Sequence, residues 1–117
     1  VEDYHASKAH QQTLTTAMAA LFQHSIDALL TPATTGPAPD AATTGDPCMN
    51  APWSYTGLPT VSFPISLTDD QLPLAIQFAG PHRHDWRLLN VAEVCERLLR
   101  PVASISQGRM IFACGIN

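Results

Sequence analysis

The sequence predicts an α/β fold, and three patterns along its 117 residues support this prediction. Residues 3–25 contain neither Gly nor Pro and carry apolar residues at helical spacing, and residues 85–100 show the same spacing. Between them, residues 32–81 hold nine of the ten prolines and short alternating apolar runs that are typical of strands. We therefore expect a proline-punctuated set of strands between two helices.

The overall composition excludes several classes of protein. Ten acidic and six basic side chains give a net charge of −4, which argues against a nucleic-acid partner. No apolar run approaches the roughly 20 residues that span a bilayer, so no membrane partner is expected. The three cysteines show no CxxC spacing and no disulfide framework, which favours a reduced, cytoplasmic location.

The first predicted helix carries one apolar stripe. Its members lie at i, i+3, i+4, i+7 and i+8, namely Leu14, Ala17, Met18, Leu21 and Phe22. The helical pattern begins without a clear N-cap residue, so we expect the sequence to be cut from something longer. A short apolar run at residues 26–32 follows and predicts a buried strand that Pro32 stops.

The middle of the chain is predicted to be a long loop followed by a hairpin. Residues 32–57 show neither a helical nor a strand period. Residues 60–66 alternate in polarity, and Pro64 inside this run predicts an edge or bulged strand. Residues 68–71 form a turn, and residues 72–79 form an antiparallel partner strand whose small alternate residues indicate cover on both faces.

The second helix is expected to begin at Asp85 as its N-cap and to end at Pro101. Its apolar stripe is formed by Leu88, Leu89, Ala92, Cys95, Leu98 and Leu99. Two helices and three or four strands are too few to cover both faces of the hairpin. The pattern therefore predicts part of a larger α/β domain, or an obligate oligomer.

No compact motif for metal binding or nucleophilic catalysis stands out. His82, His84 and Asp85 cluster, but they lack the usual zinc spacing, and a solvated loop is the better interpretation. Cys48 has no identifiable base partner. Lys8 is the only lysine and is interpreted as a solvated charge, and no G-x-S-x-G elbow or phosphate-binding loop occurs.

Four segments in order resemble the amidase signature family. These are DALLTPA at residues 27–33, YTGLPTVSFP at residues 55–64, LPLAIQFAG at residues 72–80, and the helix with Asp85, Leu88, Leu89, Ala92 and Glu96. The likeness covers about residues 3–99. Two departures are Ser54, where the family often has Asn, and Ala75, where it often has Gly.

This resemblance implies the C-terminal portion of the amidase signature fold, a mixed sheet covered by helices, incomplete as a stand-alone domain. Residues 1–100 would form this segment, and residues 101–117 match nothing and form a tail. The family hydrolyses amides with a Ser–Ser–Lys triad that lies upstream of such a segment. No catalytic residue is therefore carried over to this chain, and no cofactor or metal is implied.

The resemblance also implies a small amide as the substrate of the parent enzyme, with residues 48–57 as one wall of the acyl pocket. The candidate lining residues are Met49, Trp53, Tyr55 and Thr56. The partner of this segment would be the missing N-terminal part of the domain. Two alternatives stay open: a stand-alone ligand-binding or interaction module that dimerises, and a truncation product without a function of its own.

Overall fold

The computed structural model describes residues 2–24 and 26–99. In chain order the elements are α1 (Glu2–His24), β1 (Leu29–Pro32), the 3-10 turn η1 (Pro47–Met49), α2 (Ala51–Thr56), β2 (Thr60–Leu67), β3 (Pro73–Ala79) and α3 (Asp85–Leu99). The predicted α/β class is confirmed. The tail predicted at residues 101–117 lies outside the described residues.

The three strands form one antiparallel sheet in the order β1-β3-β2. The predicted hairpin is thus confirmed as β2 and β3. Its turn is closed by the amide of Gln71, which donates to the carbonyl of Thr68 at 2.9 Å. The register between β2 and β3 shifts between Pro64 and Ser66, as expected from a proline inside a strand. The first strand is shorter than predicted, because pairing begins only at Leu29.

The strand register gives the sheet two chemically different faces. Leu30, Phe78 and Val61 lie opposite one another across the three strands and share one face. The neighbouring row, with Gln77 at its centre and Thr31 and Ser62 on either side, lies on the other face. The first face is therefore apolar and the second carries polar side chains.

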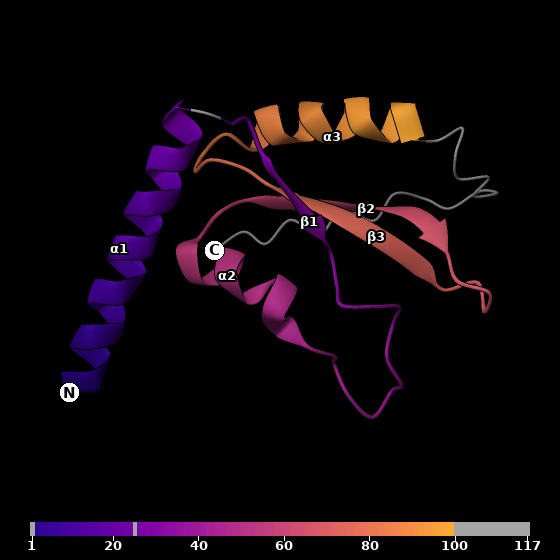
Figure 1. Ribbon diagram of the computed structural model, residues 1–117, viewed down its shortest axis with the longest axis horizontal. Coiled ribbons are helices and arrows are strands. Elements are labelled where there is room, and N and C mark those ends of the chain that lie inside the picture. Colours follow the sequence, from indigo (N-terminus) through magenta and orange to yellow (C-terminus); the bar gives the residue numbers. More distant parts are fainter. Residues whose placement is uncertain (1, 25, 100–117) are drawn as a thin grey trace.

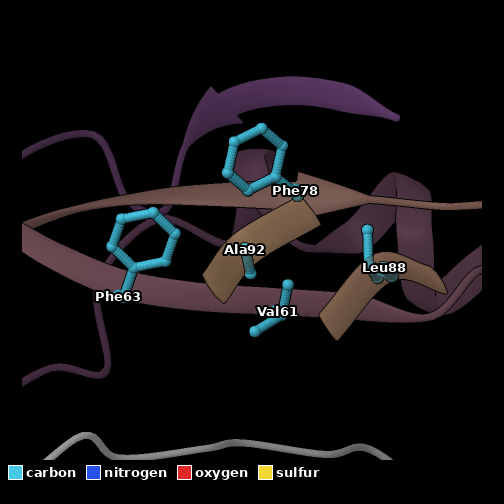
Figure 2. Close-up of a cluster of buried hydrophobic side chains, with 5 residues drawn as sticks. All are labelled: Val61, Phe63, Phe78, Leu88 and Ala92. Carbon is cyan, nitrogen blue, oxygen red and sulfur yellow. The ribbon is translucent and has the colours of Figure 1, made fainter. Parts of the chain in front are cut away.

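The core lies between the apolar face and α3. Figure 2 shows Val61, Phe63 and Phe78 from the sheet meeting Leu88 and Ala92 from the helix. The rings of Phe63 and Phe78 stack with centroids 6.0 Å apart. Burying each such side chain stabilises a fold by about 1.5–3 kcal/mol, so this cluster fixes α3 on the sheet.

The apolar stripe of α3 is narrower than predicted. Leu88 and Ala92 are buried and Cys95 packs against them, but Leu89 and Leu98 are 45% and 71% exposed. The sheet covers only the arc of the helix that is centred on Leu88 and Ala92. The predicted N-cap is also displaced by one position: Asp85 is the first helical residue, and the carbonyl of His84 accepts from the amide of Leu88 at 3.1 Å.

Helix α1 lies to the side of the sheet and packs on α2 (Figure 1). Helix α2 itself was not expected, since residues 32–57 were predicted to lack any helical or strand period. Its six residues make less than two turns, too few to reveal a period. Local signals still define it, with a proline in its first turn and Gly57 at its end in the left-handed region, at φ 71°.

Candidate functional site

The candidate site is the wall predicted at residues 48–57. Together with Pro47, the first residue of η1, it forms the wall segment, residues 47–57, which comprises η1, Asn50, α2 and Gly57. The structure places Met49 at the end of η1 and Trp53, Tyr55 and Thr56 within α2. The four candidate lining residues therefore share one short helical segment. Thr56 is buried and the other three are half-buried. Contact of these side chains with a ligand stays a prediction.

A buried glutamine of β3 holds the wall segment on the polar face of the sheet. The amide nitrogen Nε2 of Gln77 donates to the carbonyl oxygen of Met49 at 2.8 Å. The same nitrogen lies 3.3 Å from the hydroxyl of Thr31 in β1. Gln77 is only 3% exposed, so these bonds lie inside the protein. The bond from Gln77 thus fixes the position of Met49 relative to the sheet.

A second tether fixes the same segment at the surface. Asn50, which follows Met49, donates from Nδ2 to the carbonyl of Ala33 at 3.2 Å. The carboxylate of Asp46 caps η1 by accepting from the amide of Cys48 at 2.9 Å. An oxygen that accepts a backbone N–H at this position satisfies a donor that the short helix leaves free. Both contacts involve exposed side chains.

Tyr55 joins the wall segment to α1. Its hydroxyl donates to the carbonyl of Ser7 at 2.8 Å and lies 3.2 Å from Nδ1 of His10. Its backbone carbonyl accepts from Nε2 of Gln11 at 2.6 Å. The polar atoms of this predicted lining residue are thus engaged with the neighbouring helix.

Thr56 is also engaged within its own element. Its hydroxyl donates to the carbonyl of Pro52 at 2.7 Å, one turn earlier in α2. The residue is 5% exposed, and bonds from a Thr hydroxyl to the carbonyl four residues earlier are common in helices. We therefore interpret the Thr56 hydroxyl as a local structural group.

Trp53 differs from these two residues, because its polar atom has no partner among the described residues. The indole Nε1 of Trp53 is buried and makes no hydrogen bond within the described part of the chain. The same holds for Nε2 of His82, whose ring lies against Gly57 at the end of α2. Leaving a buried donor unpaired costs about 1–3 kcal/mol. Among the buried side-chain atoms of the site that the structure describes, these two nitrogens are without a partner and are available to a further polar group.

Cys48 is an exposed thiol whose surroundings disfavour the thiolate form. Desolvation, and then the hydrogen bond and negative charge of Asp46, raise the pKa of the Cys48 thiol above its usual value. A raised pKa lowers the fraction of thiolate, which is the nucleophilic form.

Other kinds of site are not seen in the described residues. No group of three or more His, Cys, Asp or Glu side chains there is placed to hold a metal ion. Within residues 2–24 and 26–99, no helix combines the length and apolar character needed to cross a membrane.

Sequence reasoning missed Gln77 and His82 as parts of the site. Gln77 appeared only as a residue of the second face of its strand and within the segment that resembles the family, with no contact assigned to it, and its partner Met49 lies in a segment that was predicted to be a loop. The signal that could have found Gln77 is its place in the central strand of the sheet, since a polar side chain at a buried position needs a hydrogen-bond partner.

Comparison with known proteins gives a consistent result. A family model described as Amidase matches residues 2–89. One subunit of the glutamyl-tRNA(Gln) amidotransferase from Wolbachia sp. subsp. Drosophila simulans (strain wRi) is 41% identical over 64 residues, covering 48% of this chain and 13% of the relative. The mitochondrial protein of the same name from Anopheles gambiae is 35% identical over 92 residues, covering 69% of this chain and 18% of the relative.

A relative with a different name matches as well. Indoleacetamide hydrolase from Allorhizobium ampelinum (strain ATCC BAA-846 / DSM 112012 / S4) is 41% identical over 49 residues, covering 42% of this chain and 11% of the relative. The chain thus spans less than a fifth of the length of these three curated relatives. Since the Amidase model matches well over half of the residues, the chain belongs to the amidase family.

Proposed function

We propose that this chain is a C-terminal part of an amide-hydrolysing enzyme that acts on C–N bonds other than peptide bonds. The observation that carries the proposal is the match of the Amidase family model over residues 2–89. The names of the relatives, which include an indoleacetamide hydrolase and a component of an amidotransferase, support chemistry at an amide bond. The short share of each relative supports a chain that acts as part of a larger fold.

Within such an enzyme, this chain supplies core strands, the covering helix α3 and one wall of the substrate pocket. The wall segment is attached to the sheet through Gln77 and to α1 through Tyr55, so its position is well defined. Trp53 supplies apolar surface to this wall, together with an indole N–H that has no partner within residues 2–24 and 26–99. The substrate is a small amide whose acyl part packs against the wall.

The chain alone is inactive in this proposal. Family members use a Ser–Ser–Lys triad, and the 117 residues contain no Gly-Gly-Ser-Ser run. Lys8, the only lysine, is exposed on α1 and donates to Oε1 of Gln11 at 3.0 Å. The nucleophile and its base therefore come from the remainder of the enzyme, in the cytoplasm and without a cofactor.

Two measurements test this proposal. The purified 117-residue chain is assayed for ammonia release from indoleacetamide, glutamine and an aryl amide, and we expect none. Mass spectrometry of size-separated cell extract should find peptides of this chain in a protein several times larger than 12.6 kDa, in a fraction that hydrolyses amides. Amide hydrolysis by the chain alone would refute its inactivity, and peptides found only at 12.6 kDa would refute the larger enzyme.

A second candidate function is a stand-alone ligand-binding or interaction module that dimerises. The observation that favours it is the exposure of large apolar side chains: Leu30, Trp86 and Leu98 are 59%, 67% and 71% exposed. Burying such surface stabilises an assembly, whether the partner is a second copy or the rest of an enzyme. Sedimentation velocity separates the two cases, because only the module is expected to form a discrete dimer.

A further inference from the structure

Gln77 is the most deeply buried polar side chain that contacts the wall segment. It is 3% exposed, and its Nε2 donates to the carbonyl of Met49 at 2.8 Å. The hydroxyl of Thr31 lies 3.3 Å from the same nitrogen. One amide group therefore joins β3, β1 and η1 at a single point.

Among the other side-chain tethers of the wall segment, the bond from Gln11 to the carbonyl of Tyr55 is half-buried, and those of Asn50 and of the Tyr55 hydroxyl lie at the surface. Asn50 and its bond to Ala33 are exposed, and the hydroxyl of Tyr55 bonds to Ser7 in an exposed environment. Exposed hydrogen bonds exchange readily with water, whereas a buried carbonyl that loses its donor has no such replacement. The bond between Gln77 and Met49 is therefore the contact whose loss affects the wall most.

The position of Met49 determines that of the candidate lining residues. Three residues separate Met49 from Trp53, and the amides of Trp53 and Ser54 donate to the carbonyl of Asn50 at 3.2 and 3.1 Å. The amide of Leu58 in turn donates to the carbonyl of Trp53 at 3.0 Å. A shift at Met49 is thus transmitted through consecutive backbone hydrogen bonds to Trp53.

We propose that Gln77 is a positioning residue of the acyl pocket, which sets the place of the wall segment, and with it of Trp53, through the carbonyl of Met49. This inference rests on the proposed function, in which the wall segment lines that pocket. Gln77 itself is not a catalytic residue, because it acts through Met49. Its amide is suited to this role, since it donates without carrying a charge into the interior.

Hydrogen exchange measured by NMR on the 117-residue chain tests the proposal. The reporters are the amides of Ser54 and Leu58 in or beside α2, and the reference amides are those that pair β2 with β3. Gln77→Met keeps the size of the side chain and removes the donor. We expect protection of the reporter amides to fall by about 5- to 140-fold, which is the loss of a buried hydrogen bond at about 1.4 kcal/mol per factor of ten.

Gln77→Glu adds a second readout, the pH dependence of reporter protection, which would not change if Gln77 acted only through its size and shape. A protonated carboxyl can donate to Met49, whereas an ionised one cannot and is a buried charge. Burial raises the pKa of such a carboxyl, because it disfavours the charged form. Reporter protection should therefore be present at low pH and be lost as the pH rises through that raised pKa.

The same pH series on the unsubstituted chain controls for the other titratable groups. On the elements around Gln77 these groups are Asp46 beside η1, Cys48 within η1 and Tyr55 in α2, while the three strands carry none. They are the same in both proteins, so the difference between the two pH profiles belongs to the substitution.

Ser62→Ala is the matched control. Ser62 lies beside Gln77 in the same row of the sheet and makes no side-chain hydrogen bond to the wall segment in the described residues. We expect this variant to leave reporter protection unchanged.

Two results would overturn the proposal: unchanged reporter protection in Gln77→Met, or an equal loss at the reporters and in the β2–β3 pair. Failure of both Gln77 variants to fold at any pH would also overturn it, since Gln77 would then serve the whole fold. No substrate is used, so a negative result here leaves the proposed function standing. Conversely, if the larger protein that contains this chain did not hydrolyse amides, the proposed function would fail, but the protection factors measured here would be unaffected.

Discussion

At the residue scale, the thiol of Cys48 offers a direct test of the electrostatics around the wall segment. Asp46→Asn removes a negative charge but keeps an oxygen that can accept from the amide of Cys48. We expect the pKa of Cys48 to fall towards its usual value and its alkylation by iodoacetamide at neutral pH to accelerate. Because desolvation is the larger cause of the raised pKa, the rate should stay below that of a small free thiol.

Quantitative mass spectrometry of the Cys48 peptide, followed from neutral to mildly alkaline pH, gives this rate. Cys95 serves as an internal reference, because it packs against the core and is distant in sequence from Asp46. An equal rate at Cys48 in both proteins would contradict the assigned effect of Asp46.

A second residue-scale prediction concerns the contact between α1 and the wall segment. Tyr55→Phe removes the hydroxyl that donates to Ser7, and we expect a loss of about 0.5–1.5 kcal/mol in the free energy of unfolding. Urea denaturation followed by circular dichroism measures this loss. Tyr4→Phe is the control, since Tyr4 is 63% exposed and its hydroxyl makes no hydrogen bond within the described residues. Equal midpoints for the two variants would contradict the role of Tyr55.

The same residues show how far sequence reasoning reaches into the site. Trp53 is a candidate because it is large and has one polar atom, and the structure leaves that atom without a partner in the described part of the chain. Tyr55 and Thr56 are candidates on the same pattern, yet their hydroxyls bond to Ser7 and Pro52. The partner of a hydroxyl depends on which elements meet in space, and a linear pattern does not contain that information.

At the element scale, the longer elements and the strand β1 were predictable, and the short helical elements η1 and α2 were not. Helix α1 and the β2–β3 hairpin extend over enough residues for their periods to appear, and their bounds agree with prediction to within about two residues. Helix α2 has six residues, and its stability depends on caps and on packing against α1. The width of the α3 stripe was also overestimated, because it depends on how much of the helix the sheet covers.

The end of α2 gives the prediction at this scale. Gly57 has φ 71°, so Gly57→Ala should cost about 1–2 kcal/mol of stability through backbone strain. An added Cβ would lie 3.5 Å from Cε1 of His82, an ordinary contact, so no steric cost is added. Gly36→Ala is the matched control, because nothing lies within 4 Å of its added Cβ. Thermal unfolding of both variants checks the difference, and equal melting temperatures would contradict it.

At the scale of the whole molecule, the described elements leave apolar surface uncovered. Leu30 shares a face with the buried Phe78 but is 59% exposed, because α3 packs mainly on β2. On α3 itself, Leu89 and Leu98 lie on opposite flanks of the buried stripe, and Trp86 lies on the far side of the helix. Apolar groups on the sheet and on both flanks of a helix are typical of a surface that packs against further structure.

This surface yields a prediction that separates the two candidate functions. If the chain is part of a larger amidase fold, its exposed apolar surface fits the rest of the enzyme and not a second copy of the chain. Self-association in sedimentation velocity should then be weak and without a defined stoichiometry. If it is a stand-alone module, a discrete dimer should form, because a two-fold interface is self-complementary.

In both cases Leu30→Ser together with Leu98→Ser should reduce association while the fold persists, since neither side chain belongs to the buried cluster. Leu72→Ser, at a partly exposed leucine near the hairpin turn, is the control and should leave association unchanged. A discrete dimer that the double substitution abolishes would favour the module over the enzyme segment, and a monomer at every concentration would contradict both expectations.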